Sequence, residues 1–404
     1  MNIPRLSVDL LQPVADALCG PGGLPRLGWR LRQIGHTPRN PVTGGLYRVS
    51  GQVVNGRASE PAGFTAVLKV LRFPKDAPAW LRADEPSHWN YWRREALAYR
   101  GGLLASIGGS GLCVPRFLAA HEPDEDTVWL WLEHVDGVPA TAWPPERYLT
   151  AARDLATTQA PYLAGRPLPE SPWLRHDWLD AWAPTLPSAS LSVLEDDAAW
   201  AHPLIRQALP REAANATRRL AAGRDEFLRV TARLPATICH HDFWPPNLMS
   251  CAGSQTVALD WSWVGIGPAG LDAANLVLDA KSSGYLPSNR LAELDGEVLD
   301  AYLAGLTEMG WRGTTAQIQL GHDVTAALRF GLDVPELLML ARNPARHAPL
   351  EKRHGRPIEQ IVANRAAVTL YALSLADRAR PLITSTCRGR RGDPGRGHGR
   401  GCAG

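Results

Sequence analysis

The chain lacks the features typical of metal-clustered, secreted or membrane proteins. Its six cysteines form no CxxC pair and no cluster at ligand spacing. In a chain of 404 residues this predicts reduced thiols in a cytosolic protein rather than a disulfide framework. The sequence opens with no basic stretch followed by an apolar segment, and it has no run of 18 apolar residues. We therefore expect neither a signal peptide nor a membrane span.

Surplus charge is also scarce outside the end of the chain. The net charge is +3, and residues 387–404 carry five arginines against one aspartate, so the rest of the chain is close to −1. The body therefore offers no broad basic surface for nucleic acid. The Gly/Arg-rich end has no aromatic residue to stack on bases and too few apolar residues to bury. We predict a disordered, solvated tail.

Two lobes are expected from the length and from a change in pattern along the chain, since a domain usually has about 100–200 residues. Strand-like runs occur at 45–54, 64–73 and 127–137, and a helix is expected over 87–106 with Ser87 as its cap. Beyond residue 131, amphipathic helix-forming stretches dominate, at 147–160, 211–233, 290–309 and 357–378. The sequence predicts an α+β protein with a small β-rich lobe over 1–131, a larger helical lobe over 132–386, and the tail over 387–404.

The stretch "ICHHDFWPPNLMS" at 238–250 allows two interpretations. His240 and His241 beside Asp242 suggest zinc, but adjacent side chains diverge and no further His or Cys stands at ligand spacing. The alternative uses Asp242 as a base and Asn247 as a metal ligand, together with Asp260 in "ALDWSW". Amide and carboxylate oxygens are ligands that Mg²⁺ prefers, so we favour this second interpretation.

A lysine and a glutamate complete the set of groups that phosphoryl transfer requires. Lys69 lies at the centre of the strand-like "AVLKV", where a buried ammonium is costly unless it is paired. Glu95, in the helix that follows, supplies a carboxylate for that pair. Phosphoryl transfer needs a lysine on the nucleotide phosphates, an acid that holds it, a carboxylate at the attacking hydroxyl, and metal ligands. The sequence contains all of these groups in that order.

The same residues carry a resemblance to a known group of enzymes. "HHDFWPPN" resembles the His-x-Asp-x-x-x-x-Asn loop of protein-kinase-like enzymes, and "LDW" is similar to their Asp-Phe-Gly position. The following "VGIGPAGLDAANLV" and the "REALAY" helix resemble segments of the aminoglycoside phosphotransferase and choline kinase group. The resemblance covers roughly residues 27–280 and implies a two-lobed protein-kinase-like fold with ATP and Mg²⁺ between the lobes.

The resemblance also implies a role for each matching residue. Asp242 would be the catalytic base, and Asn247 and Asp260 would bind Mg²⁺. Lys69 would bind the nucleotide phosphates while Glu95 holds it, and the adenine would lie against the linker of Glu133, His134 and Val135. Asp272 would brace the catalytic loop, and His240 would pack beside the metal aspartate.

Three departures from the group's pattern stand out. His241 occupies a position where the group usually has Gly, and Trp244-Pro245-Pro246 replaces a frequent His-Pro-Gly. The segment expected to cover the phosphates has only Gly44, Gly45 and Gly51 and no full glycine motif.

The acceptor is expected to be a small molecule with a hydroxyl group. An antibiotic such as an aminoglycoside or a macrolide is the leading interpretation, and choline, ethanolamine or a sugar is the alternative. A non-catalytic nucleotide-binding pseudokinase is the alternative of another class. Acidic and aromatic residues at 173–182 and 194–200 suggest a wall for a cationic acceptor. An amphipathic helix explains the first segment equally well, and a solvated loop is the favoured interpretation of the second. The residues concerned are Trp173, Asp177, Trp178, Asp180 and Trp182. Oligomeric state and the choice between ATP and GTP stay open.

Overall fold

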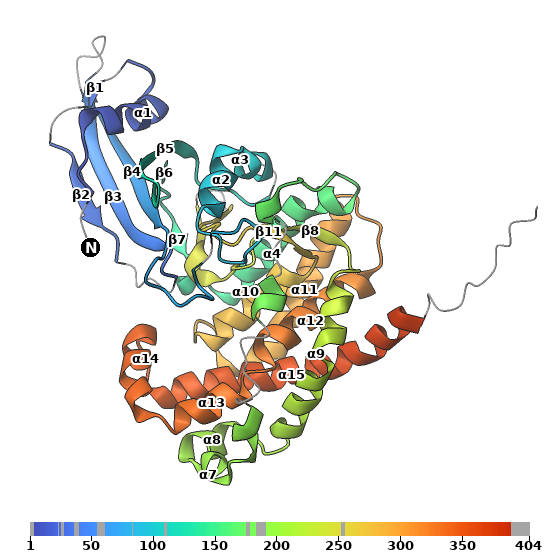
Figure 1. Cartoon of the computed structure of the whole chain (residues 1–404). Helices are drawn as coiled ribbons and strands as arrows, with labels where there is room; N and C mark the ends of the chain where they lie inside the picture. The colour runs from blue at the N-terminus through green and yellow to red at the C-terminus, as the bar shows by residue number, and fades with distance from the viewer. Residues whose placement is uncertain are drawn as a thin grey trace, which may run out of the picture.

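The computed structural model describes residues 4–22, 24–25, 28–35, 40–54, 61–82, 84–108, 111–174, 178–182, 191–251 and 255–388. The chain forms a small lobe built on a β-sheet, drawn in blue to teal in Figure 1, and a larger lobe of helices drawn mostly in green to red. The expected two-lobed α+β architecture is confirmed.

The small lobe contains one antiparallel sheet. Its strands are β1 (Leu24–Pro25), β2 (Arg30–Gln33), β3 (Thr43–Val54), β4 (Ala62–Arg72), β5 (Phe117–Asp124) and β6 (Thr127–Glu133). They follow the order β1-β3-β4-β6-β5, with β2 paired to β3. Helix α1 (Val8–Cys19) packs on one face, where Leu11 and Val14 join a core with Leu68 and Trp131. The three strand-like runs of the sequence are therefore β3, β4 and β6.

The alternation of side chains along β4 determines where Lys69 lies. Ala66, Leu68 and Val70 belong to the core under α1. Since successive side chains of a strand point to opposite faces, Lys69 lies on the other face, toward the helical lobe. The register places Lys69 opposite Leu46 of β3 and Leu130 of β6, at the middle of the sheet.

The prediction of one helix over 87–106 is wrong in its bounds. The structure has α2 (Arg94–Arg100) and α3 (Leu103–Ile107), with turns from residue 85 to Arg93. The buried guanidinium of Arg94 donates to the backbone oxygens of His88 and Trp89, both at 2.6 Å, and holds this segment in turns. Gly102, at φ 73°, then separates the two helices, because a left-handed residue interrupts helical geometry.

The large lobe is built from long helices. Four of them match the amphipathic stretches of the sequence, namely α4 (Pro145–Leu163), α9 (Ala213–Thr231), α11 (Leu291–Glu308) and α15 (Ile358–Arg388). The long helix α12 (Thr315–Phe330) is not among the predicted stretches. Shorter helices are α5 (Trp178–Trp182), α7 (Asp197–Ala201), α8 (Pro203–Ala208), α10 (Leu271–Ser282), α13 (Val334–Ala341) and α14 (His347–His354). Helix α15 continues through Arg388, so it includes the first two residues of the predicted tail, while residues 389–404 lie outside the described residues.

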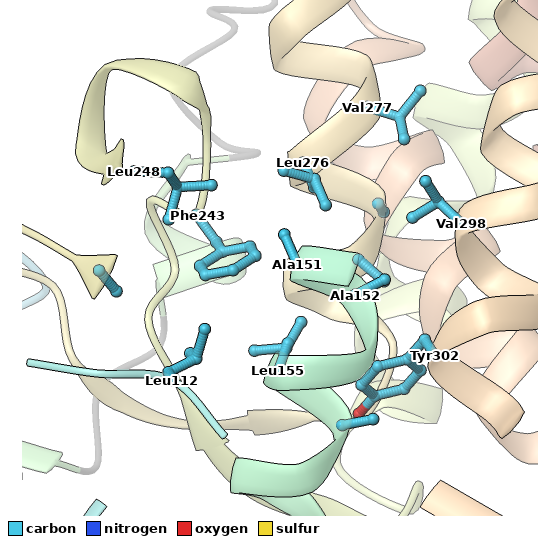
Figure 2. Close-up of a cluster of buried hydrophobic side chains, with 14 of the residues drawn as sticks. Leu112, Ala151, Ala152, Leu155, Phe243, Leu248, Leu276, Val277, Val298 and Tyr302 are labelled. Carbon is cyan, nitrogen blue, oxygen red and sulfur yellow. The ribbon is translucent and has the colours of Figure 1, made fainter. Parts of the chain in front are cut away.

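Two small sheets hold the segment that contains the opening motif. Strand β8 (Ala236–Cys239) pairs with β11 (Gly265–Pro268), and β9 (Leu248–Ser250) pairs with β10 (Thr256–Ala258) and β7 (Val138–Pro139). The loop between β8 and β9 is anchored by Phe243 and Leu248, both fully buried. Figure 2 shows these two side chains beside Leu155 of α4 and Leu276 of α10, so the loop is fixed to the helical core.

Within the described residues, no helix combines the length and the apolar character needed to cross a membrane.

Candidate active site

Lys69 forms a buried ion-pair network with two carboxylates. Its Nζ lies 2.6 Å from Oε2 of Glu95 on α2 and 2.8 Å from Oδ1 of Asp260, which follows β10. Burial acts to lower the pKa of Lys69, but the attraction of Asp260 and Glu95 outweighs it and raises the pKa. The structure therefore brings together three residues that lie up to 191 positions apart in the sequence, and the ammonium stays charged.

The carboxylate of Asp260 is held in its ionised form. Burial acts to raise its pKa, but Lys69 outweighs burial by charge and by hydrogen bonding, and the pKa is lowered to about 2. Asp260 has a backbone φ of 54°, a left-handed conformation uncommon for residues other than Gly, Asn and Asp. The backbone N–H of the preceding Leu259 donates to the backbone oxygen of Asn247 at 2.7 Å. This bond ties the Asp260 turn to the catalytic loop.

Asp272, at the start of α10, braces the loop as the sequence predicted. Its two carboxylate oxygens accept the backbone N–H groups of His240 and His241, each at 2.8 Å. Gln159 of α4 donates to the same carboxylate at 3.2 Å. His241 has a φ of 63°, the left-handed conformation that glycine adopts without strain. The turn at His241 thus takes a glycine-like conformation although its side chain is buried.

Asp242 and Asn247 are in direct contact. The Nδ2 group of Asn247 donates to Oδ2 of Asp242 at 2.8 Å and to its backbone oxygen at 3.0 Å. With its amide nitrogen directed at Asp242, Asn247 presents its carbonyl oxygen as the available ligand atom. Burial raises the pKa of Asp242 to about 7, with Asp279 and Asp260 acting in the same direction and Arg329 and Asn247 against it.

His240 packs inside the loop and does not face a metal position. Its Nε2 lies 2.8 Å from the backbone oxygen of Leu259, and its Nδ1 accepts the backbone N–H of Asp242 at 3.3 Å. Its ring lies 4.5 Å from that of Trp261. Both ring nitrogens are occupied by protein contacts, which disfavours the zinc interpretation. Over the described ranges, no group of three or more His, Cys, Asp or Glu side chains has an arrangement that could hold a metal ion.

The structure describes Glu133 and Val135, the linker residues that we predict to contact the nucleotide, but neither is among the residues that line the cleft between the lobes. The carboxylate of Glu133 accepts the backbone N–H of Arg116 at 3.1 Å, so its side chain is turned back to β5. Val135 is half-buried in the segment between β6 and β7. Contact of either residue with adenine stays a prediction.

The glycines expected to cover the phosphates lie in strand β3 instead of a loop. A Cβ atom at Gly45 would meet the ring of Tyr47 at 2.6 Å, and one at Gly51 would meet Phe64 at 2.7 Å. Packing against aromatic rings therefore accounts for Gly45 and Gly51, while a Cβ atom at Gly44 would meet the side chain of Arg72 at 2.9 Å. The turn before β3 supplies Asn40 to the cleft, and the first residue of β3 supplies Thr43.

These groups open onto one cleft of about 600 Å³ between the lobes. The predicted site residues that line it are Asp242, Asn247 and Asp260. Aromatic rings from several segments form another part of the wall, namely Trp80, Trp89, Trp244, Trp263, Tyr285 and Phe330. Further charged lining residues are Asp279, Arg329, Asp333, Arg353 and Arg365. The volume is that of a small-molecule site.

The predicted acceptor wall is wrong for the residues that the structure describes. Trp178 is buried in the core against Trp263 and His241, and half-buried Trp173 packs on the core of the lobe; neither lines the cleft. Asp180 is exposed and pairs with Arg224. Asp177 lies outside the described residues, as does the side chain of Trp182. The acidic run 194–200 forms surface ion pairs away from the cleft.

Sequence reasoning missed Arg329, which lies beside the predicted base. This residue of α12 donates to the backbone oxygen of His241 at 3.1 Å and lies 2.7 Å from Asp279 and 3.8 Å from Asp242. Its guanidinium also lies 4.7 Å from the ring centre of Trp178. No local pattern marks it, because its contacts reach across 88 positions of sequence.

Comparison with known proteins places this geometry in a family. Residues 69–312, more than half of the chain, match the phosphotransferase enzyme family. No curated protein matches the sequence significantly. Among solved structures, the chain is similar to a choline kinase from Cryptosporidium parvum, with 11% identity, a TM-score of 0.49, and coverage of 95% of this chain and 99% of that one.

Two further solved structures show a similarity of the same size. An aminoglycoside phosphotransferase from Alicyclobacillus acidocaldarius has 14% identity, a TM-score of 0.49, and coverage of 94% and 98% of the two chains. An amicoumacin kinase has 12% identity, a TM-score of 0.45, and coverage of 84% and 90%. Similarities this weak identify no acceptor. The family match does identify the class: the chain belongs to the phosphotransferase enzyme family, and the predicted enzyme class, a phosphotransferase with an alcohol group as acceptor, is confirmed.

Proposed function

We propose that the chain is a kinase that uses Mg-ATP to phosphorylate a hydroxyl group of a small molecule, with an antibiotic as the leading acceptor. The observation that carries the proposal is the convergence of Asp242, Asn247 and Asp260 on one cleft, with Lys69 held against Asp260 at its wall. A pseudokinase typically lacks at least one of these groups, whereas here all four are present, with Lys69 paired to Asp260 and Asn247 bonded to Asp242.

The nucleotide would lie on the side of the cleft formed by the small lobe. Lys69 would bind the phosphates, and Glu95 would hold the lysine in place, since their 2.6 Å ion pair is buried. The adenine would lie against the linker at Glu133 and Val135. Backbone groups of this linker would serve for recognition, because the side chain of Glu133 already accepts the N–H of Arg116.

Asp260 and Asn247 fit a magnesium ion by their chemistry. A carboxylate kept ionised by Lys69 and an amide oxygen are hard ligands, and Mg²⁺ typically takes few protein ligands and completes its shell with water and phosphate oxygens. When bound, the ion would neutralise charge on the phosphates. The contact between Asn247 and Asp242 couples the metal position to the base.

Asp242 would orient the acceptor hydroxyl and take its proton. The hydroxyl oxygen would then form a bond to the γ-phosphorus while the bond from that phosphorus to the leaving ADP oxygen breaks. Asp272 contributes by fixing the backbone of the loop through the N–H groups of His240 and His241. The products would be ADP and a phosphorylated acceptor.

The test is release of ADP from Mg-ATP with a panel of aminoglycosides, macrolides, choline, ethanolamine and simple sugars. Stimulation by one antibiotic class would support the leading acceptor, whereas stimulation by choline or a sugar would move the enzyme to metabolism. We expect Asp242→Ala to abolish turnover and to leave nucleotide affinity nearly unchanged, and Asp260→Ala to remove Mg²⁺-dependent nucleotide binding. Near-full transfer by Asp242→Ala would contradict the role of the base.

A further inference from the structure

The wall of the cleft contains a ladder of three tryptophan rings in contact, Trp80, Trp89 and Trp263, which have no role in the proposed phosphoryl transfer. Trp80 and Trp89 stack with their ring centres 6.4 Å apart and their planes at 19°. Trp89 meets the edge of Trp263 at 5.7 Å. All three residues line the cleft. The ladder joins the segment after β4 to the turn after Asp260, and it lies in the same cleft as the catalytic loop.

Trp80 is the exposed end of this ladder. Its side chain is 54% exposed, while Trp89 is buried at 8%. Folding alone gives little reason to keep a large ring exposed at the wall of a cleft, because burial of a tryptophan is strongly favourable. An aromatic ring open to a small-molecule site is suited to stack on a flat ligand surface.

Two of the carboxylates that line the cleft, those of Asp279 and Asp333, are already neutralised by arginines. Asp279 pairs with Arg329 at 2.7 Å, and Asp333 makes two bonds to Arg365 at 2.6 and 2.9 Å. Each pair lies at the wall of the cleft, so its two charges largely cancel for a ligand. A cationic acceptor would have to displace an arginine to gain a carboxylate partner.

Arg353 carries a charge at this wall that the ion pairs described above do not neutralise. It lies on α14, is exposed, and is the cleft-lining charged residue to which the structure, over its described ranges, gives no ion pair. Apart from Asp242, which is kept for the acceptor hydroxyl, and Asp260, which is paired with Lys69, the cleft therefore has no surplus negative charge. This differs from the acidic wall that the sequence suggested.

We propose that the acceptor is a hydroxyl compound with a flat apolar ring and no net positive charge, and that its ring stacks on Trp80. This inference rests on the proposed function and names its acceptor class. Arg353 increases the affinity for acceptors that carry an anionic group. Polycationic acceptors are disfavoured, because the carboxylates of Asp279 and Asp333 are already paired with arginines and are not available to bind a cation.

Binding of three matched probes to the full chain with Mg²⁺ and AMP-PNP tests this inference. The probes share a benzyl alcohol ring and differ in charge: 4-(hydroxymethyl)benzoate, 1,4-benzenedimethanol and 4-(aminomethyl)benzyl alcohol. We expect calorimetric Kd values for the anionic and neutral probes to be at least about tenfold lower than for the cationic probe. We expect Trp80→Ala to raise the Kd of both by about tenfold, in line with the usual energy of stacking on an aromatic side chain, and Trp80→Phe to restore most of the affinity.

A matched pair of variants on α14 tests the role of charge. Arg353→Ala should weaken only the anionic probe, by about fivefold for one exposed ion pair. Lys352→Ala, one position away and outside the cleft lining, should leave all three Kd values unchanged. Thermal melts of each variant separate an effect on binding from a failure to fold.

Several results would overturn the inference. Tightest binding of the cationic probe or of an aminoglycoside would do so, as would an unchanged Kd in Trp80→Ala or the absence of binding by every probe at millimolar concentration. Failure of the proposed function would appear differently, as no Mg²⁺-dependent binding of AMP-PNP and no ADP release with any acceptor, because the probe assay needs no turnover.

Discussion

The left-handed turn at His241 allows a sharp prediction about stability. We consider the pair His241→Gly and His241→Ala, which remove the same imidazole and leave the same space beside Trp178. At a φ of 63°, a residue with a Cβ atom is strained by about 1–2 kcal/mol, and glycine is not. Glycine also loses more freedom on folding, at a cost of about 0.5–1 kcal/mol. The strain is the larger effect, so His241→Gly should be more stable than His241→Ala by about 0.5–1 kcal/mol.

The measurement is the free energy of unfolding in urea for both variants, with Gly296→Ala as the opposite control. Gly296 lies inside helix α11, where an added Cβ would meet no atom within 4 Å. Here alanine should be the more stable residue, by about 0.5–1 kcal/mol, because the site has ordinary helical geometry. The same exchange should therefore have opposite signs at the two positions.

Relative to the wild type, both His241 variants should lose about 1–3 kcal/mol, because each removes a buried ring. The backbone contacts of His241 to Asp272 and Asn275 involve main-chain atoms, so both variants keep them. If His241→Ala proved as stable as His241→Gly or more so, the left-handed conformation assigned to this turn would be refuted.

Three further predictions concern buried charges. Lys69→Met should lower the free energy of unfolding by about 3–5 kcal/mol, because it leaves Glu95 and Asp260 buried without a cation. Glu95→Gln should lower it by less, because Asp260 still holds the lysine. Urea unfolding and Mg-ATP titration compare the two variants. Burial acts to lower the pKa of His322, but Asp295 and Asp323 raise it from 6.5 to about 9. The stability from this network should be complete below pH 6.5 and be lost as the pH rises through about 9, so the stability difference between wild type and His322→Gln should shrink over that range; a constant difference would contradict it. Arg329→Met should lower kcat by at least about tenfold while the KM for ATP changes little, since its contacts are with the loop of Asp242 and not with Lys69; steady-state kinetics should also show partial rescue in Arg329→Lys.

The residues that we propose for catalysis could be singled out from the sequence because local patterns mark them. Asp242 and Asn247 lie five positions apart in one loop, and Asp260 directly follows a short strand. Lys69 was predicted because a lysine in an apolar strand needs a partner, and the alternation of β4 places it on the face opposite α1. In such cases the chemistry of one residue type at one position is enough to indicate its environment.

The structure departs from the sequence prediction where tertiary contacts override local preference. Residues 87–93 have helical spacing, yet the guanidinium of Arg94 donates to the carbonyl oxygens of His88 and Trp89 and holds the segment in turns. This segment carries Trp89 to the cleft, and no window of sequence shows that it will face Trp263. Trp178 is also a tryptophan in a segment with acidic neighbours, but it is buried in the core and does not line the cleft.

The family match therefore says more about the phosphate side of the cleft than about the wall where we propose that the acceptor binds. The residues that we propose to act on the phosphates lie within 69–312, the part of the chain that matches the phosphotransferase enzyme family. The acceptor wall is assembled from Trp80 and Trp89, from the turn after Asp260, and from helices α12 and α14. Asp272 and the buried ring of Phe243 hold the loop of Asp242 from beneath. The segments of Trp80, Trp89 and α14 can therefore change without loss of these supports, whereas Arg329 of α12 contacts the loop directly. A chain can thus keep its chemistry while its acceptor changes, and the paired carboxylates at Asp279 and Asp333 are the structural reason to look beyond cationic acceptors for this one.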